Sequence, residues 1–184
     1  PLSVSLLFEL IADVGFPPGV VQLVYGPGDP VGSCLAASPL VDKIAFTGGG
    51  VTGRKIQMAA ATNFKKITLE LGGKSPNIIF ADADPDVALE YALFAIFAGQ
   101  GEVCSAGSRL LLDRRLGGDF LHRLVSACEK IVVGSGLDEA TEMGPLISRG
   151  HQKKVLDYIQ AGCSEGAELL CGGGIYNDKR STGN

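Results

Sequence analysis

The chain has 184 residues, of which 46% are hydrophobic and 20% are charged, and its formal net charge is −4. This hydrophobic fraction excludes a wholly disordered chain, and the length fits one ordinary domain or parts of two. Without an excess of positive charge, a nucleic-acid-binding or anionic membrane surface is disfavoured. No apolar run is long enough to cross a bilayer. We therefore expect neither a nucleic-acid partner nor a membrane partner.

The five cysteines are an odd number, and no two of them have the C-x-x-C spacing of a metal or redox motif. This pattern argues against a disulfide framework and against a zinc site, so we expect no bound metal. A reducing compartment is the simpler interpretation, and we expect a cytoplasmic protein.

The first 70 residues alternate between helical and extended hydrophobic patterns. Helices are expected over 2–14, 31–37 and 54–61, and strands over 20–25, 43–46 and 66–70. A glycine-rich turn over 48–53 separates the second strand from the helix that follows.

The same alternation continues in the second part of the chain. Strands are expected over 77–80, 109–112 and 168–171, and helices over 86–98, 119–132 and 150–161. Asp84 and Pro85 have the pattern of a helix N-cap followed by proline at the first helical position. Alternating strands and helices predict an α/β fold with a parallel sheet covered by helices. The segment 71–76 is the best candidate for a domain boundary.

The turn Gly48-Gly49-Gly50-Val51-Thr52-Gly53 fits the pattern G-x-G-x-x-G between a strand and a helix. Glycines there let backbone N–H groups approach a pyrophosphate at a helix N-terminus. An acidic residue about twenty positions later would bind a ribose, and Glu70 is in range. The alternative is a tight turn without a ligand. A nucleoside-triphosphate loop is excluded, because Arg54 and Lys55 stand where Lys and then Ser or Thr are required.

Two other residues are candidates for chemistry. Cys104 follows a long apolar helix and lies among small residues, which leave the access that a nucleophilic thiolate needs. Glu70 ends a parallel strand, where α/β sheets place ligand-binding groups. The alternatives are a buried structural cysteine and an exposed loop carboxylate. The remaining four cysteines, Cys34, Cys128, Cys163 and Cys171, are interpreted as small buried hydrophobes, and the two histidines, His122 and His151, as solvated helix residues.

A pair of catalytic carboxylates is a further alternative, because Asp82, Asp84 and Asp86 follow one strand. Their spacing around Pro85 is better explained by helix capping. Ser105 does not fit a hydrolase nucleophile turn, since Val103 occupies the place of the first glycine.

Taken together, these segments resemble the aldehyde dehydrogenase superfamily over about residues 2–174. The stretch Leu69-Glu70-Leu71-Gly72-Gly73-Lys74 is similar to the glutamate motif of the family, and residues 97–108 are similar to its cysteine motif. The resemblance implies that residues 1–71 are the C-terminal part of a Rossmann-like NAD(P)-binding domain. Residues 72–184 would then be the N-terminal part of an α/β catalytic domain.

The resemblance also implies a reaction and roles for residues. The Cys104 thiolate would attack an aldehyde to give a thiohemiacetal, hydride would pass to NAD or NADP, with NAD favoured, and a thioester would remain on Cys104. Glu70 would be the general base that activates water for hydrolysis, in place of the ribose-binding role that spacing suggested. Cofactor contacts are implied for Phe46, Thr47, Gly48, Gly49, Gly53 and Leu71.

The chain departs from the family pattern at several points. Gly49 replaces a serine after Phe46-Thr47-Gly48, Gly99 stands where asparagine is frequent, and Glu102 stands where glutamine is frequent. Other family segments have no counterpart, so we expect a central segment of a longer enzyme, incomplete by itself, whose parent is a homodimer or homotetramer. The alternatives are a CoA-acylating aldehyde dehydrogenase, which the presence of Glu70 disfavours, and a non-catalytic fragment or structural member of the family.

Overall fold

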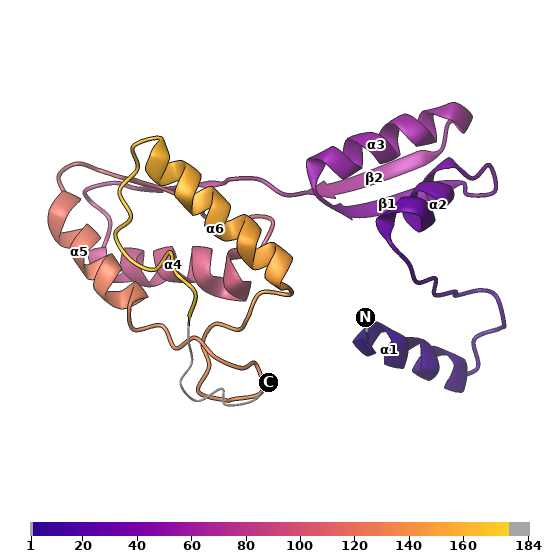
Figure 1. Ribbon diagram of the computed structural model, residues 1–184, viewed down its shortest axis with the longest axis horizontal. Helices are drawn as coiled ribbons and strands as arrows, with labels where there is room; N and C mark the ends of the chain where they lie inside the picture. Colours follow the sequence, from indigo (N-terminus) through magenta and orange to yellow (C-terminus); the bar gives the residue numbers. More distant parts are fainter. Residues whose placement is uncertain (1, 177–184) are drawn as a thin grey trace. The chain divides into compact units, whose positions relative to one another are not determined.

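Residues 2–176 are described by a computed structural model (Figure 1). The chain forms two units that divide between Leu71 and Gly72. Each unit contains one parallel pair of strands whose crossover connection includes a helix. The protein is therefore a mixed α/β protein with parallel sheets, as the alternating pattern predicted.

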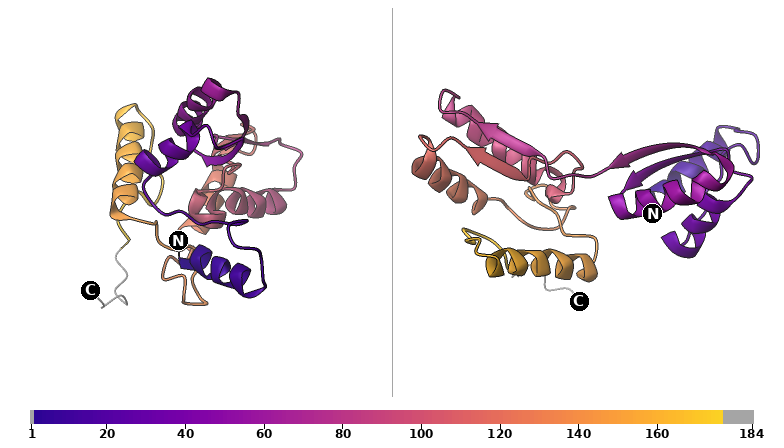
Figure 2. Two further views of the ribbon diagram at one scale, coloured as in Figure 1. Left: turned by 90° about the vertical axis from the view of Figure 1, so that its right-hand side faces the viewer. Right: turned by 90° about the horizontal axis from the view of Figure 1, so that it is seen from above.

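The first unit is built on strands β1 (Lys43–Gly48) and β2 (Lys66–Leu71), which pair in parallel from Lys43 opposite Lys66 to Gly48 opposite Leu71. The connection between the strands contains helix α3 (Gly50–Ala60) and a 3₁₀ turn, η2 (Ala61–Asn63). Helix α3 lies along the sheet, next to the short helix α2 (Ser33–Ala37) (Figures 1 and 2). Ala36 of α2 and Ala60 of α3 are buried small side chains of this unit.

Two further helical segments precede β1. Helix α1 (Leu2–Asp13) has the expected amphipathic pattern but buries none of its residues. A π-helical turn, η1 (Gly28–Gly32), leads into α2, so the single helix expected over 31–37 is two segments.

The second unit is built on strands β3 (Pro76–Ile79) and β4 (Arg109–Leu112), which pair in parallel from Pro76 opposite Arg109. Helix α4 (Pro85–Phe97) and a 3₁₀ turn, η3 (Ala98–Gly101), connect them. Helices α5 (Gly117–Cys128) and α6 (Arg149–Ser164) follow.

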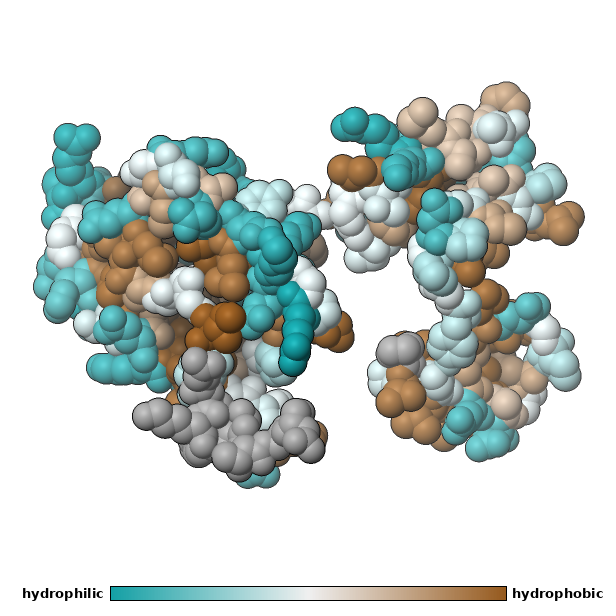
Figure 3. Space-filling model, in the orientation of Figure 1, coloured by the Kyte–Doolittle hydropathy of each residue, from teal (hydrophilic) through white to brown (hydrophobic). Residues whose placement is uncertain are grey.

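The core of this unit lies between α4, α5 and the sheet. Its buried members are Ile79 of β3, Ala92 of α4 and Phe120 of α5. Leu110, Leu112 and other partly buried side chains pack around them. Hydrophobic residues also reach the surface of this unit among hydrophilic ones (Figure 3).

The N-terminus of α4 is formed as predicted. Asp84 is the N-cap, and its carboxylate accepts hydrogen bonds from the backbone N–H groups of Asp86 and Val87 at 2.9 and 3.2 Å. Pro85 occupies the first turn, where it loses no helical hydrogen bond. This geometry supports capping as the role of Asp84.

Two expected strands are wrong. Residues 20–25 and 168–171 have irregular structure, and neither segment pairs with a strand in the described residues 2–176. An apolar run forms a β-strand only when a neighbouring strand supplies partners for its backbone hydrogen bonds. The hydrophobic pattern records the tendency to be buried, and it does not show whether a partner is present.

Several helix boundaries also differ from expectation, and the differences are clearest for α3 and α5. Helix α3 begins at Gly50, so most of the glycine-rich segment is the first turn of a helix and not a separate turn before Arg54. Helix α5 spans residues 117–128, whereas the pattern predicted 119–132. In both cases the apolar periodicity located the helix but not its ends.

Candidate functional site

The glycine motif forms the junction between β1 and α3. Gly49 is extended and serves as the N-cap of α3, and Gly53 N–H donates to the Gly49 carbonyl at 3.0 Å. The N–H groups of the first helical residues have no partner within their own helix, as at every helix N-terminus. A Cβ added at Gly49 or Gly50 would meet nothing within 4 Å, so this backbone is open to an approaching group. The geometry fits a pyrophosphate at a helix N-terminus.

Gly53 has a different role from the first glycines of the motif. It is buried, and a Cβ at this position would lie 2.9 Å from Leu71 Cδ2 and 3.8 Å from Leu69 Cδ1. Such a contact is too short for a real Cβ, so the absence of a side chain allows α3 to pack closely on β2. Among the residues implied to bind cofactor, Gly53 and Leu71 therefore contact each other.

The other implied cofactor residues lie on the same edge of this sheet. Phe46, Thr47 and Gly48 end β1, and an added Cβ at Gly48 would lie 2.5 Å from Phe46 Cζ. Thr47 is the register partner of Glu70 on β2. Because β1 and β2 are parallel, their carboxyl ends bring the glycine motif and Glu70 to one sheet edge.

Glu70 is exposed at the carboxyl end of β2. The segment after it, Gly72 to Lys74, is also exposed, and the Lys74 ammonium donates to the Gly73 carbonyl at 3.0 Å. An exposed carboxylate at a strand end can accept a proton from water, as a general base must. The position suits that role as well as it suits ribose binding.

Cys104 lies between α4 and β4, in a segment that begins with η3 and that we call the cysteine loop (residues 98–108). The Cys104 side chain is exposed. Two residues further on, Ala106 is buried, and its N–H donates to the Val103 carbonyl at 3.0 Å. The loop therefore turns tightly just after Cys104 and leaves the sulfur accessible, as a nucleophile requires.

The C-terminal part of the cysteine loop is fixed to α4 and to the sheet. Gly107 N–H donates to the Ala95 carbonyl at 2.9 Å, and an added Cβ at Gly107 would lie 3.3 Å from the Cβ atoms of Ala95 and Asn77. At the start of β4, Arg109 N–H and Nε donate to the carbonyls of Ser75 and Lys74 at 3.2 and 2.7 Å. The cysteine loop thus ends beside the segment that follows Glu70 in the sequence.

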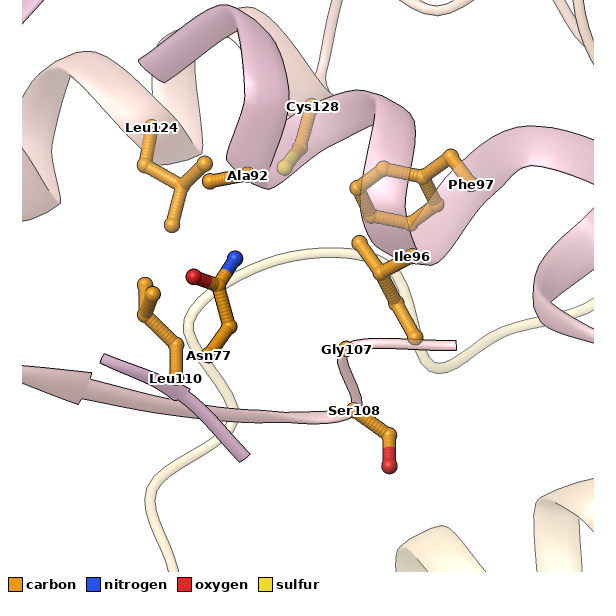
Figure 4. A pocket seen from close by; sticks show the side chains of 9 residues that line it. All are labelled: Asn77, Ala92, Ile96, Phe97, Gly107, Ser108, Leu110, Leu124 and Cys128. Atoms are coloured by element: carbon orange, nitrogen blue, oxygen red, sulfur yellow. The ribbon is translucent and has the colours of Figure 1, made fainter. Parts of the chain in front are cut away.

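A small apolar pocket of about 140 Å³ lies behind this anchored part of the loop (Figure 4). Its lining comes from β3, α4, the cysteine loop, β4 and α5, namely Asn77, Ala92, Ile96, Phe97, Gly107, Ser108, Leu110, Leu124 and Cys128. Cys104 does not line this pocket. The pocket is therefore part of the packing that supports the loop, and the candidate nucleophile lies outside it.

The sequence interpretation of the other cysteines was partly wrong. Cys34 and Cys163 are exposed, while Cys128 and Cys171 are partly buried. Burial, together with the neighbouring Cys171 thiol, raises the pKa of the Cys128 thiol above its ordinary value. Cys34 lies on α2, which has only five residues, and Cys163 lies on α6, which has no buried residues. Neither helix therefore buries its cysteine.

His151 is a partly exposed helix residue, but it has a contact that the sequence interpretation did not include. It lies in the first turn of α6 and its Nε2 atom is 3.2 Å from Oε1 of Glu102 in the cysteine loop. Sequence reasoning missed this pair because the two residues are far apart in the chain and neither belongs to a motif on its own. His122, in contrast, is exposed on α5, as expected.

Within residues 2–176, no group of three or more His, Cys, Asp or Glu side chains is arranged to hold a metal ion. No helix among these residues is long and apolar enough to cross a membrane.

The model of the aldehyde dehydrogenase family matches residues 1–184. The chain belongs to this family. It is 49% identical over 180 residues to the mitochondrial aldehyde dehydrogenase of Homo sapiens, covering 97% of this chain and 35% of that protein. It is 51% identical over 173 residues to the betaine aldehyde dehydrogenase of Bacillus subtilis, covering 94% of this chain and 35% of that protein.

Solved structures agree with this assignment. An aldehyde dehydrogenase of Bacillus cereus in complex with NAD⁺ is 42% identical, with a TM-score of 0.94, and the match covers 97% of this chain and 36% of that one. The likeness supports the Rossmann-like α/β character that the sequence predicted. The chain spans about a third of the length of these relatives.

Proposed function

We propose that the protein containing this chain oxidises an aldehyde to a carboxylic acid with NAD(P) as hydride acceptor. Family membership supports aldehyde oxidation in general terms. The observation that carries the specific mechanism is the accessible thiol of Cys104, in a loop whose C-terminal end is hydrogen-bonded to α4 and to the segment before β3. A fixed but accessible sulfur is the arrangement that nucleophilic catalysis requires.

In the proposed reaction, the Cys104 thiolate adds to the aldehyde carbon and forms a C–S bond. The backbone N–H of Cys104 stabilises the resulting oxyanion. A bound NAD(P) supplies the hydride acceptor, and loss of hydride from that carbon leaves a thioester on Cys104. Glu70 then takes a proton from water, the hydroxide adds to the thioester carbon, and the acid leaves as the thiolate is restored.

We propose that residues 1–71 form part of the cofactor domain. The open backbone of Gly49 would face the pyrophosphate, with Phe46, Thr47 and Gly48 beside it. Gly53 and Leu71 would hold the helix and the strand in place. NAD is favoured over NADP, because the B. cereus relative was solved with NAD⁺. Residues 72–184 would be part of the catalytic domain that carries Cys104.

The substrate is proposed only as an aldehyde. The relatives named for betaine aldehyde and for mitochondrial aldehyde dehydrogenase are almost equally similar to this chain. A cytoplasmic location and a homodimeric or homotetrameric parent stay predictions of the sequence and of the family resemblance.

The proposal is tested by trapping the thioester. Trypsin releases residues 75–109 as one peptide, in which Cys104 is the only cysteine. In a Glu70→Gln variant of the full-length protein, mixed with NAD⁺ and propanal, mass spectrometry of this peptide should show a propionyl adduct. An unmodified peptide alongside continuing NADH formation would disprove the covalent mechanism. Release of the adduct only after CoA is added would instead favour the CoA-acylating alternative.

A further inference from the structure

The cysteine loop is joined to helix α6 by a contact that the proposed reaction does not use. Glu102, two residues before Cys104, pairs with His151 at 3.2 Å between Oε1 and Nε2. Both side chains are partly exposed, at 48% for Glu102 and 36% for His151. His151 bonds to the carboxylate as a neutral Nε2–H donor or, when protonated, as a cation.

The part of the loop before Cys104 needs such support, because its backbone is irregular. Gly99, Gln100 and Gly101 all have left-handed φ angles, of +59°, +59° and +75°. Of these three, Gln100 carries a side chain, which disfavours this conformation unless the surroundings hold it. Glu102 N–H donates to the Gly99 carbonyl at 3.0 Å, which closes a local turn but attaches it to nothing else.

A second contact joins the same part of the loop to the segment before α6. The Gln100 side chain lies over Gly144, where an added Cβ would be 2.8 Å from Gln100 Nε2. Gln100 and Glu102 thus both reach residues 144–151, from positions on the same side of Cys104. This contact does not depend on the charge of either Glu102 or His151.

The position of His151 is itself set by the helix N-terminus. Ser148 is the N-cap of α6, and its Oγ accepts a hydrogen bond from His151 N–H at 3.1 Å. Capping fixes the first turn, so the imidazole is presented by a rigid element. The cysteine loop is therefore held by α4 after Cys104, through Gly107, and by α6 before it, through Glu102.

We propose that Glu102 and His151 are positioning residues that hold the cysteine loop against α6 and so keep the Cys104 sulfur in place for attack. This inference rests on the proposed function of Cys104. Neither residue touches the reacting atoms in the proposed mechanism, so their effect is exerted through the loop. A loop that is held at both ends lowers the conformational cost of reaching the attack geometry.

The test compares Glu102→Ala, His151→Ala and the double variant in the full-length protein, with NAD⁺ and propanal. Each single change should slow the NADH burst about three- to fivefold, as expected for a partly exposed pair, and leave the KM for NAD⁺ unchanged. The double variant should be no slower than the slower single variant, because either single change already removes the contact between Glu102 and His151. Amide hydrogen exchange should become faster over residues 98–108, while the strands keep their protection.

The matched control is Lys153→Ala, which removes a charge from the same helix and breaks a pair with Asp157 at 2.7 Å. It should leave the burst and the exchange of residues 98–108 unchanged. Glu102→Gln keeps the shape and an acceptor oxygen, so it should stay within about twofold of the unmodified protein. This variant also protects the test against a folding defect in the alanine variants.

Three results would overturn the proposal. The first is an unchanged burst in both single variants, even if exchange becomes faster. The second is a double variant whose loss is the product of the two single losses. The third is a Glu102→Gln variant as slow as Glu102→Ala. Failure of the proposed function is seen separately, because exchange of residues 98–108 is measured without substrate and does not depend on whether Cys104 is the nucleophile.

Discussion

The two units have the same β–α–β arrangement, but their candidate site residues lie at opposite ends of the strands. Each has two parallel strands joined through a helix, β1–α3–β2 in the first and β3–α4–β4 in the second. In the first unit, the glycine motif and Glu70 lie at the carboxyl ends of the strands. In the second, the cysteine loop lies between the end of α4 and the start of β4, at the amino ends of the strands.

This difference shows where the general rule for ligand sites in α/β sheets applies and where it does not. Ligand sites at the carboxyl ends of parallel strands explain why Glu70 stood out. Cys104 lies at the other edge, where the rule predicts nothing, and it was singled out by its small neighbours and by the family motif. The segment 72–75 runs from the carboxyl end of β2 to the amino end of β3, so both candidate groups flank the same short connection in the sequence.

The largest expected effect is at the amino edge of the second unit. Cys104→Ser should lower aldehyde oxidation by about 10³-fold or more, because a hydroxyl is a far weaker nucleophile than a thiolate. NADH formation with a panel of aldehydes measures it. The matched control is Cys163→Ser, an exposed cysteine on α6, which should keep full activity. Full turnover by the Cys104 variant would show that Cys104 is not the nucleophile.

The next effect is at the carboxyl edge of the first unit. Glu70→Gln should preserve the NADH burst and slow steady-state turnover by roughly 10²- to 10⁴-fold, because only thioester hydrolysis needs the base. Stopped-flow absorbance at the NADH band separates the two phases. Glu90→Gln, which neutralises an exposed carboxylate on α4, is the control and should change neither phase. If the burst disappears together with the steady state, Glu70 acts before hydrolysis.

A smaller effect concerns the packing that supports the carboxyl edge. Gly53→Ala should destabilise the protein by about 1–2 kcal/mol relative to Gly50→Ala, because only the first adds a Cβ within 2.9 Å of Leu71. Both changes gain helix propensity, so the comparison isolates the contact. Chemical denaturation followed by circular dichroism provides the measurement. Equal stability of the two variants would show that Leu71 moves aside freely.

The smallest effect lies just after β4 in the second unit. Arg115 donates from its guanidinium and its backbone N–H to Asp113, and these hydrogen bonds lower the pKa of Asp113 from 3.8 to about 2. Because the folded pKa is the lower one, this contribution to stability is present above about pH 4 and is lost as the pH falls towards 2. Arg115→Gln should return the pKa towards 3.8 in a carboxyl NMR titration, whereas Arg114→Gln should not. An unchanged pKa in the first variant would mean that the backbone bond alone holds it down.

Local features were predicted from the sequence more accurately than features that need a distant partner. The Asp84 cap depends on neighbouring residues alone, and it was found. The strands expected at 43–46 and 109–112 were found as well, and each has a parallel partner, β2 and β3 respectively. The strand expected at 20–25 was wrong, because no strand among residues 2–176 pairs with it.

In the candidate site, too, local features were predicted and a contact between distant residues was not. Cys104 was singled out by its small neighbours and by the family motif, and its thiol is exposed. The pairing of Glu102 with His151 could not be predicted, since neither residue carries information about the other. The roles of Cys104 and Glu70 stay predictions until the variants above are measured.

The topology of the second unit also bears on how the chain matures during synthesis. Lys43 of β1 is the register partner of Lys66, and Pro76 of β3 is the register partner of Arg109. The second pair is further apart in the sequence, so the second crossover is the longer one. Parallel pairing cannot close before the later strand has been made, and longer closures are entropically costlier. The cysteine loop is the last part of that crossover. Cys104 therefore leaves the ribosome before β4, and the hydrogen bonds from Gly107 and Arg109 that fix its loop can form only afterwards.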